Sequence, residues 1–152
     1  MLKDNKYLKE LNKVLDEHEK RCREFDTKYI EISKKYGFKS KEMRSLYKEY
    51  EDIFEYPFPS GYCKVAEEWK HCVEQNYDTL VINSHHIFEN EFYDFIDCIE
   101  QSGIECFDVL LHAWEDPLIQ KLKENGYKCI ESCFMIKINK YGYVMEGMRF
   151  II

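Results

Sequence analysis

The sequence predicts an α/β fold: an N-terminal antiparallel helical hairpin, then a small mixed sheet of about four strands with flanking helices and a C-terminal β-hairpin. Three observations indicate this fold. Residues 8–36 have heptad spacing, helix and strand patterns alternate over 62–138, and a strand, turn and strand pattern ends the chain. We therefore expect a hairpin arm at 1–56, a connector at 57–61 and an α/β domain at 62–152.

The first helix is predicted by apolar or semi-apolar positions that recur at alternating steps of three and four residues. These positions are Leu8, Leu11, Leu15, His18, Cys22, Phe25, Tyr29, Ile32 and Tyr36. Such a seam is typical of coiled coils. It either packs on the same chain or forms a homodimer through residues 8–36.

A second helix is predicted directly after the first. Gly37 suits the left-handed conformation that ends a helix, and Ser40 is a good N-cap. The apolar stripe of the second helix is Met43, Leu46, Tyr47, Tyr50, Ile53 and Phe54. A short loop between two amphipathic helices favours an antiparallel pair.

The rest of the chain alternates between helix and strand patterns. Helices are predicted over residues 62–73 and 88–99, with buried strands at 79–82 and 104–111. Asp116 caps a third helix that has Pro117 at its first position. Residues 127–138 alternate like a strand, and a turn at 139–142 leads to a last strand at 143–152. Near one face of the alternating strand we expect Ile130, Phe134, Ile136 and Ile138.

Composition narrows the class of protein. The formal charge is −7, with 14 basic and 13 acidic side chains in residues 1–60 against 8 and 16 in 61–152. No apolar run is long enough to cross a bilayer, and the start of the chain is too charged for a signal peptide. We expect a cytoplasmic protein without membrane contact. Alanine is scarce, and residues encoded by A/T-rich codons are abundant. This composition indicates a bacterial, phage or mobile-element source.

The seven cysteines are odd in number and irregularly spaced. Zinc sites usually contain close ligand pairs, and this chain has none of the CxxC type. We expect reduced thiols, with Cys72, Cys106 and Cys133 packed as small apolar groups, and neither a metal nor a cofactor.

Residues 79–138 resemble the C-terminal half of GNAT-type acyltransferases. The resemblance lies in the segment KLKENGY at 121–127 and the strand segment CFMIK at 133–137, which follow a strand, helix, strand and short helix. It implies an acyl-coenzyme A transferase whose pyrophosphate site is a glycine-containing loop at a helix N-terminus. The corresponding stretch here, HHIFENE at 85–91, has no glycine and contains Glu89 and Glu91.

Residues 32–46, ISKKYGFKSKEMRSL, resemble a bacterial helix-turn-helix. That resemblance implies that the second helix enters the DNA major groove. The side chains directed at DNA would be Lys39, Lys41, Arg44 and Lys48. The negative charge of the whole chain disfavours nucleic acid as a partner.

Two further groups of polar residues are candidates. His85, His86 and His112 follow the two predicted parallel strands, where ligand sites of open α/β sheets collect, and Asp108 could join them. An acidic helix face is predicted from Glu89, Glu91, Asp94, Asp97 and Glu100. This face would suit a partner protein with a basic surface.

The chain has no phosphate loop, nucleophile motif or cofactor fingerprint. We therefore expect a non-enzymatic protein-binding or regulatory protein that acts through the helical arm and the acidic α/β face. A divergent GNAT-like transferase is the first alternative, and DNA binding through residues 32–46 is the second.

Overall fold

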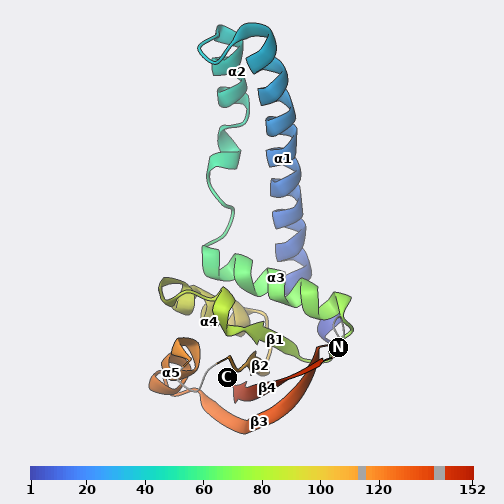
Figure 1. The fold of residues 1–152 in the computed structure, drawn as a ribbon, viewed down its shortest axis with the longest axis vertical. Helices are drawn as coiled ribbons and strands as arrows, with labels where there is room; N and C mark the ends of the chain where they lie inside the picture. The colour runs from blue at the N-terminus through green and yellow to red at the C-terminus, as the bar shows by residue number, and fades with distance from the viewer. Residues whose placement is uncertain (113–115, 139–142) are drawn as a thin grey trace. The chain divides into compact units, whose positions relative to one another are not determined.

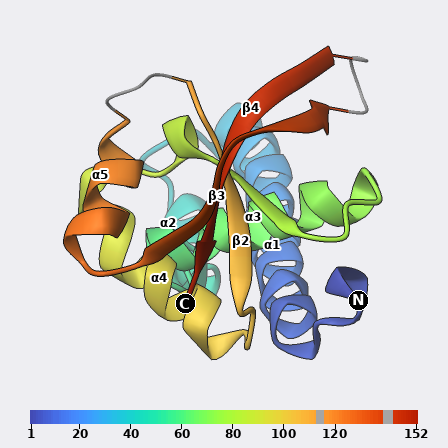
Figure 2. The same ribbon diagram turned by 90° about the horizontal axis from the view of Figure 1, so that it is seen from below.

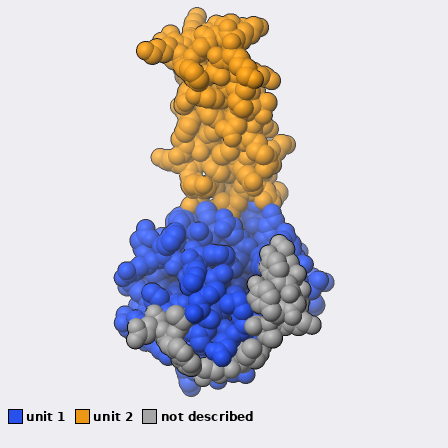
Figure 3. Space-filling model, in the orientation of Figure 1, with its two compact units in different colours: residues 1–12, 59–152 blue, residues 13–58 orange. Residues whose placement is uncertain are grey.

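The computed structural model describes residues 1–112, 116–138 and 143–152, together with their side chains except those of residues 132–135, 137–138 and 143–144. It contains two compact units (Figure 3). One comprises residues 1–12 and 59–152, called the α/β unit here, and the other is the hairpin unit, residues 13–58. Residues 1–12, which the sequence assigned to the arm, thus belong to the α/β unit.

The hairpin unit contains most of helix α1 (Lys6–Tyr36), all of α2 (Lys41–Glu49) and a short 3-10 helix, η2 (Glu51–Phe54). Gly37 has φ +85°, and the Ser40 hydroxyl accepts a hydrogen bond from the Met43 N–H at 3.1 Å. These are the predicted helix end and helix cap. Within this unit α1 and α2 lie side by side and run antiparallel (Figure 1).

The hairpin core is small and largely aromatic. Phe25 of α1 packs with three buried residues that follow the turn, Met43, Leu46 and Tyr50. Tyr29, Ile32 and Ile53 are partly buried against this cluster. Seam positions of the long helix therefore pack within the chain, and Leu8 and Leu11 are likewise buried.

The α/β unit follows the predicted order of elements. Its helices are α3 (Ser60–Glu74), α4 (Phe92–Gln101) and α5 (Pro117–Glu124), and its strands are β1 (Leu80–Asn83), β2 (Cys106–Leu110), β3 (Lys128–Ile138) and β4 (Tyr143–Ile151). Single 3-10 turns occur at η1 (Leu2–Asp4), η3 (Ser84–His86) and η4 (Glu89–Glu91). Because α3 begins at Ser60, residues 60 and 61 are helical and do not belong to the predicted connector.

The four strands form one mixed sheet in the order β1-β2-β4-β3 (Figure 2). β1 and β2 are parallel, whereas β4 pairs antiparallel with both β2 and β3. The α/β class, the four-stranded mixed sheet and the C-terminal strand pair are thus confirmed. The predicted turn at 139–142 lies outside the described residues.

One face of the sheet carries the core of the α/β unit. The register places Leu80 beside Phe107, and Phe107 beside Phe150, on this face. Phe95 of α4 packs edge to face on Phe107 with ring centroids 6.0 Å apart, so α4 covers it. Both Phe95 and Phe107 are fully buried.

Strand β3 departs from simple alternation. Its register with β4 shifts between Cys129 and Glu131 and again between Ser132 and Phe134. Ile130 falls at the first shift and is half exposed, whereas Ile136 is buried, so the shift separates two side chains that were expected near one face. The side chains of Phe134 and Ile138 are outside the described set.

Two of the three cysteines predicted to be packed can be placed. Cys72 is buried and contacts the backbone of Val81, whereas Cys106 is half-buried. Burial raises the pKa of the Cys72 thiol, and likewise that of Cys98, to about 12. The Cys133 side chain lies outside the described residues.

Candidate functional site

One exposed apolar surface of the hairpin unit is a chain of aromatic rings, Tyr29, Phe38, Tyr47 and Phe54, called the aromatic stripe here. Ring centroids are 6.0 Å apart for Tyr29 and Phe38, 6.4 Å for Tyr29 and Tyr47, and 5.6 Å for Tyr47 and Phe54. The exposed fractions of Phe38, Tyr47 and Phe54 are 68%, 44% and 56%. Such contiguous exposed aromatic surface is typical of an interaction site.

The predicted basic residues lie in the same unit as the stripe. Lys39 precedes α2, and Lys41, Arg44 and Lys48 are on it; all four are exposed. Lys39 follows Phe38 directly, and Arg44 is one helical turn before Tyr47. The stripe is therefore bordered by positive charge.

The hairpin geometry also bears on the helix-turn-helix resemblance. Phe25 contacts Tyr50, and Tyr29 contacts Tyr47, so positions pair in opposite directions along α1 and the segment after the turn. In a helix-turn-helix the two helices instead cross at roughly 90–120°. Residues 32–46 thus form an antiparallel pair and not the crossed pair that the resemblance implies.

Two of the predicted cluster residues meet at the carboxyl ends of β1 and β2. The rings of His85 and His112 stack with centroids 3.9 Å apart and planes 27° apart. Asn83 Oδ1 accepts from the His85 backbone N–H at 3.1 Å and lies 2.9 Å from His112 Nε2. An amide oxygen only accepts, so His112 carries a proton on Nε2.

The environment of His112 favours its neutral form. Partial burial lowers the pKa of His112, and the positive charge that His85 would carry lowers it further. Neutral His112 can accept a proton or coordinate a ligand, but no third group completes a metal site: the described residues contain no cluster of three or more potential metal ligands.

The other two predicted cluster residues are used elsewhere. His86 Nδ1 pairs with the carboxylate of Glu68 on α3. Asp108 is buried in β2 and accepts two hydrogen bonds from Arg149 on β4, at 2.7 and 3.0 Å. The predicted cluster of four is therefore split, because side chains on α3 and β4 engage two of its members.

The same edge of the sheet is fixed by a buried polar contact. The Ser84 hydroxyl donates to Asp116, which also caps α5 by accepting from the Leu118 N–H at 3.0 Å. Both Ser84 and Asp116 are buried. Since its hydroxyl bonds to a carboxylate and not to an imidazole, Ser84 lacks the contact that would activate a serine nucleophile.

The predicted acidic face is mostly engaged within the α/β unit. Glu91 is 4% exposed and accepts from the Phe88 N–H and from the Ser60 hydroxyl, so it does not belong to the surface. The other carboxylates lie at the surface. Asp97 accepts from Tyr62, Glu100 accepts from Tyr127 at 2.9 Å, Glu89 pairs with Lys121 at 3.6 Å, and Asp94 is exposed.

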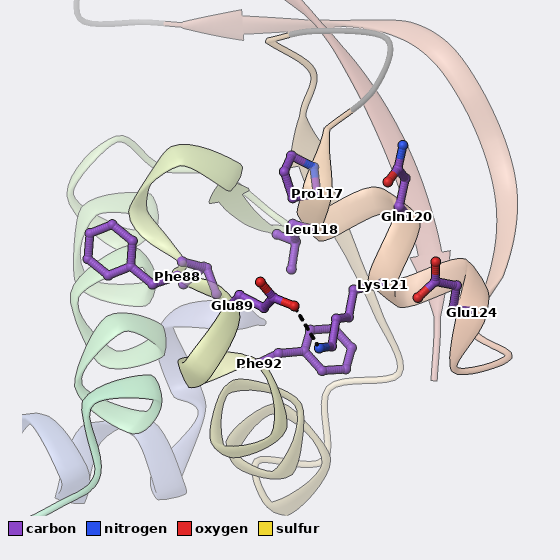
Figure 4. Close-up of a pocket in the computed structure, with 9 residues that line it drawn as sticks. Phe88, Glu89, Phe92, Pro117, Leu118, Gln120, Lys121 and Glu124 are labelled. Carbon is purple, nitrogen blue, oxygen red and sulfur yellow. Dashed lines mark ion pairs between the residues drawn. The ribbon is translucent and has the colours of Figure 1, made fainter.

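A pocket of about 270 Å³ lies between the start of α4 and helix α5 (Figure 4). Its apolar lining is Ile87, Phe88, Phe92, Pro117 and Leu118, and its polar lining is Glu89, Gln120, Lys121 and Glu124. The volume is slightly below the roughly 300–1,000 Å³ typical of ligand pockets, so a whole coenzyme A would not be enclosed.

Sequence reasoning missed the aromatic stripe and Lys121. The sequence places Tyr47 and Phe54 in the apolar stripe of the second helix, where six apolar residues exceed what one facing helix can cover. That excess was the available signal for an exposed aromatic surface. The sequence contains no corresponding signal for Lys121, because only the packing of α5 beside α4 places this residue in a pocket.

No protein-family model matches this chain, and no curated protein or solved structure is similar enough to count as a match. In the part of the chain that the structure describes, no helix combines the length and apolarity needed to span a bilayer.

Proposed function

We propose that this chain is a non-enzymatic protein-binding or regulatory protein, possessing its main binding surface on the hairpin unit. The observation that carries the proposal is the exposure of the aromatic stripe. Folding would normally bury rings of this size, and a stripe that stays in water loses that stabilisation unless a partner covers it.

Charge indicates the chemistry of the partner. Between residues 33 and 48 there are six basic side chains and a single acidic one, Glu42. Exposed aromatics combined with arginine are also the composition typical of binding hot spots. The partner that fits is a protein with an apolar patch bordered by carboxylates.

The experiment compares three baits in an affinity pull-down from a bacterial lysate, with bound proteins identified by mass spectrometry. The baits are the unchanged chain, the double variant Phe38→Ser, Tyr47→Ser, and the control Tyr93→Ser. Tyr93 is as exposed as Phe38 but lies on α4, outside the stripe. We expect a partner that the unchanged chain and the control retain and the double variant loses, with affinity falling about thirtyfold.

Two results would contradict the proposal. One is a partner that all three baits retain equally, and the other is the absence of any protein that distinguishes the double variant from the control. Light scattering of the same three proteins tests the homodimer through residues 8–36. A dimer in all three would favour self-association through the seam and not through the stripe.

The predicted acidic face remains a second surface within the same proposal, directed at a basic partner. The exposed Asp94 and the surface carboxylates of Glu89, Asp97 and Glu100 support it. Glu91 is buried and therefore does not contribute a carboxylate to this surface. A variant with Asp94→Asn and Asp97→Asn should leave the stripe-dependent partner bound if the two surfaces act separately.

A GNAT-like transferase is the second candidate, and the order of elements favours it. β1, α4, β2, α5 and β3 follow one another as the resemblance implies. Against it, the pocket beside η4 has two carboxylates for its single lysine. We expect no binding of acetyl-coenzyme A by calorimetry. A micromolar dissociation constant would rank the transferase first.

A further inference from the structure

The pocket between α4 and α5 holds one lysine in an apolar setting. Lys121 is 25% exposed, and its Nζ lies 5.7 Å from the ring centroid of Phe92 and 5.6 Å from that of Tyr93. Both rings attract the ammonium group by cation–π interaction. Figure 4 shows this ammonium group directed into the pocket, beside the Phe92 ring.

The counter-charge of Lys121 is weakly held. Glu89 Oε1 lies 3.6 Å from Lys121 Nζ, but the Glu89 side chain is 84% exposed at the rim of the pocket. An exposed ion pair of this kind contributes little to stability, so little is lost when a ligand carboxylate and a ligand ammonium group insert between the two charges.

We propose that this pocket binds a free α-amino acid with an apolar side chain, such as leucine. The carboxylate of the ligand pairs with Lys121, its ammonium group pairs with Glu89, and its side chain lies against the apolar lining formed by Phe92 and Leu118. The inference is independent of the hairpin surface and would add a ligand-regulated site in the other unit.

The charges of the lining select a zwitterion over other small ligands. One lysine and two glutamates, Glu89 and Glu124, line the pocket, so a phosphate or dianion meets net repulsion. A simple amine is repelled by the positive charge of Lys121. A neutral apolar molecule removes water from the ion pair and offers its charges no new polar contact. The volume of about 270 Å³ suits one amino acid and excludes a large cofactor.

The test is a titration of the isotope-labelled full chain with L-leucine, followed by NMR chemical shifts. We expect perturbed amides in residues 87–93 and 118–124. N-acetyl-L-leucine lacks the ammonium charge and L-leucinamide lacks the carboxylate, and each should bind about tenfold more weakly or worse, since one charge-assisted contact is lost. L-leucinamide also represents the N-terminal residue of a peptide.

Variants separate the pocket from the rest of α5. Lys121→Gln should weaken leucine binding about tenfold, whereas Lys123→Gln, exposed on the same helix and outside the lining, should leave it unchanged. Unchanged spectra of both the unaltered chain and the control at millimolar leucine would overturn the proposal. Equal binding of leucine, its N-acetyl form and its amide would do so as well.

Discussion

At the scale of single residues, the stacked imidazoles of His85 and His112 form a contact that depends on the strands on either side. Their approach to 3.9 Å needs two strand ends held side by side, which the parallel β1 and β2 provide. The hydrogen bond between His112 and Asn83 sets the tautomer of His112. Sequence spacing predicted that these histidines would meet, but not that His86 would turn to Glu68.

The lowered pKa of His112 makes stability depend on pH. Because the folded pKa lies below the ordinary value of 6.5, the contribution of neutral His112 to the free energy of unfolding is complete above that pH and is lost as the pH falls through the folded value. We expect His112→Gln to flatten the fall in urea midpoint between neutral and mildly acidic pH. His71→Gln, on exposed α3 surface, should keep the slope of the unchanged chain.

At the scale of elements, the contact between α3 and α4 depends on one small residue. A Cβ added at Gly61 would lie 2.6 Å from the Glu91 carbonyl oxygen and from the Phe95 backbone nitrogen. Backbone atoms cannot move aside as flexible side chains can. The sequence alone assigned Gly61 to an extended connector, because a glycine after two prolines reads as loop when no neighbouring helix is known.

Gly61→Ala should therefore destabilise the protein although alanine is the better helix former. Overpacking of this kind costs about 1–3 kcal/mol, which exceeds the gain of about 1 kcal/mol from helix propensity. Chemical denaturation measures the difference, with Glu67→Ala on the exposed side of α3 as control. A variant as stable as the unchanged chain would show that α3 and α4 can separate without cost.

At the scale of the whole molecule, the two units differ in how much core each contains. The hairpin unit of residues 13–58 has four buried apolar residues in its cluster, Phe25, Met43, Leu46 and Tyr50. The α/β unit has a sheet with a helix-covered face, and most of the buried hydrophobic residues belong to it. Units below about 40–60 residues are marginal without other support.

We therefore expect hydrogen exchange to separate the two units. Amides of residues 13–58 should exchange faster than those of β1 and β2, because local opening of a small core costs less free energy. Phe25→Ala should accelerate exchange in residues 13–58 further, with Tyr93→Ser as a control of similar size on the surface. Equal protection in both units would show that the chain opens as one cooperative body.

The sequence by itself determined the elements and the class of fold. Heptad spacing gave α1, the glycine and serine at 37 and 40 gave the turn, and Asp116 with Pro117 gave the start of α5, because capping and periodicity act over a few residues. Only the tertiary structure decided which apolar residues stay in water, which carboxylates are buried and where Lys121 points. Those properties depend on which elements face each other, and a helix with more apolar residues than its neighbour can cover does not specify which of them are left exposed.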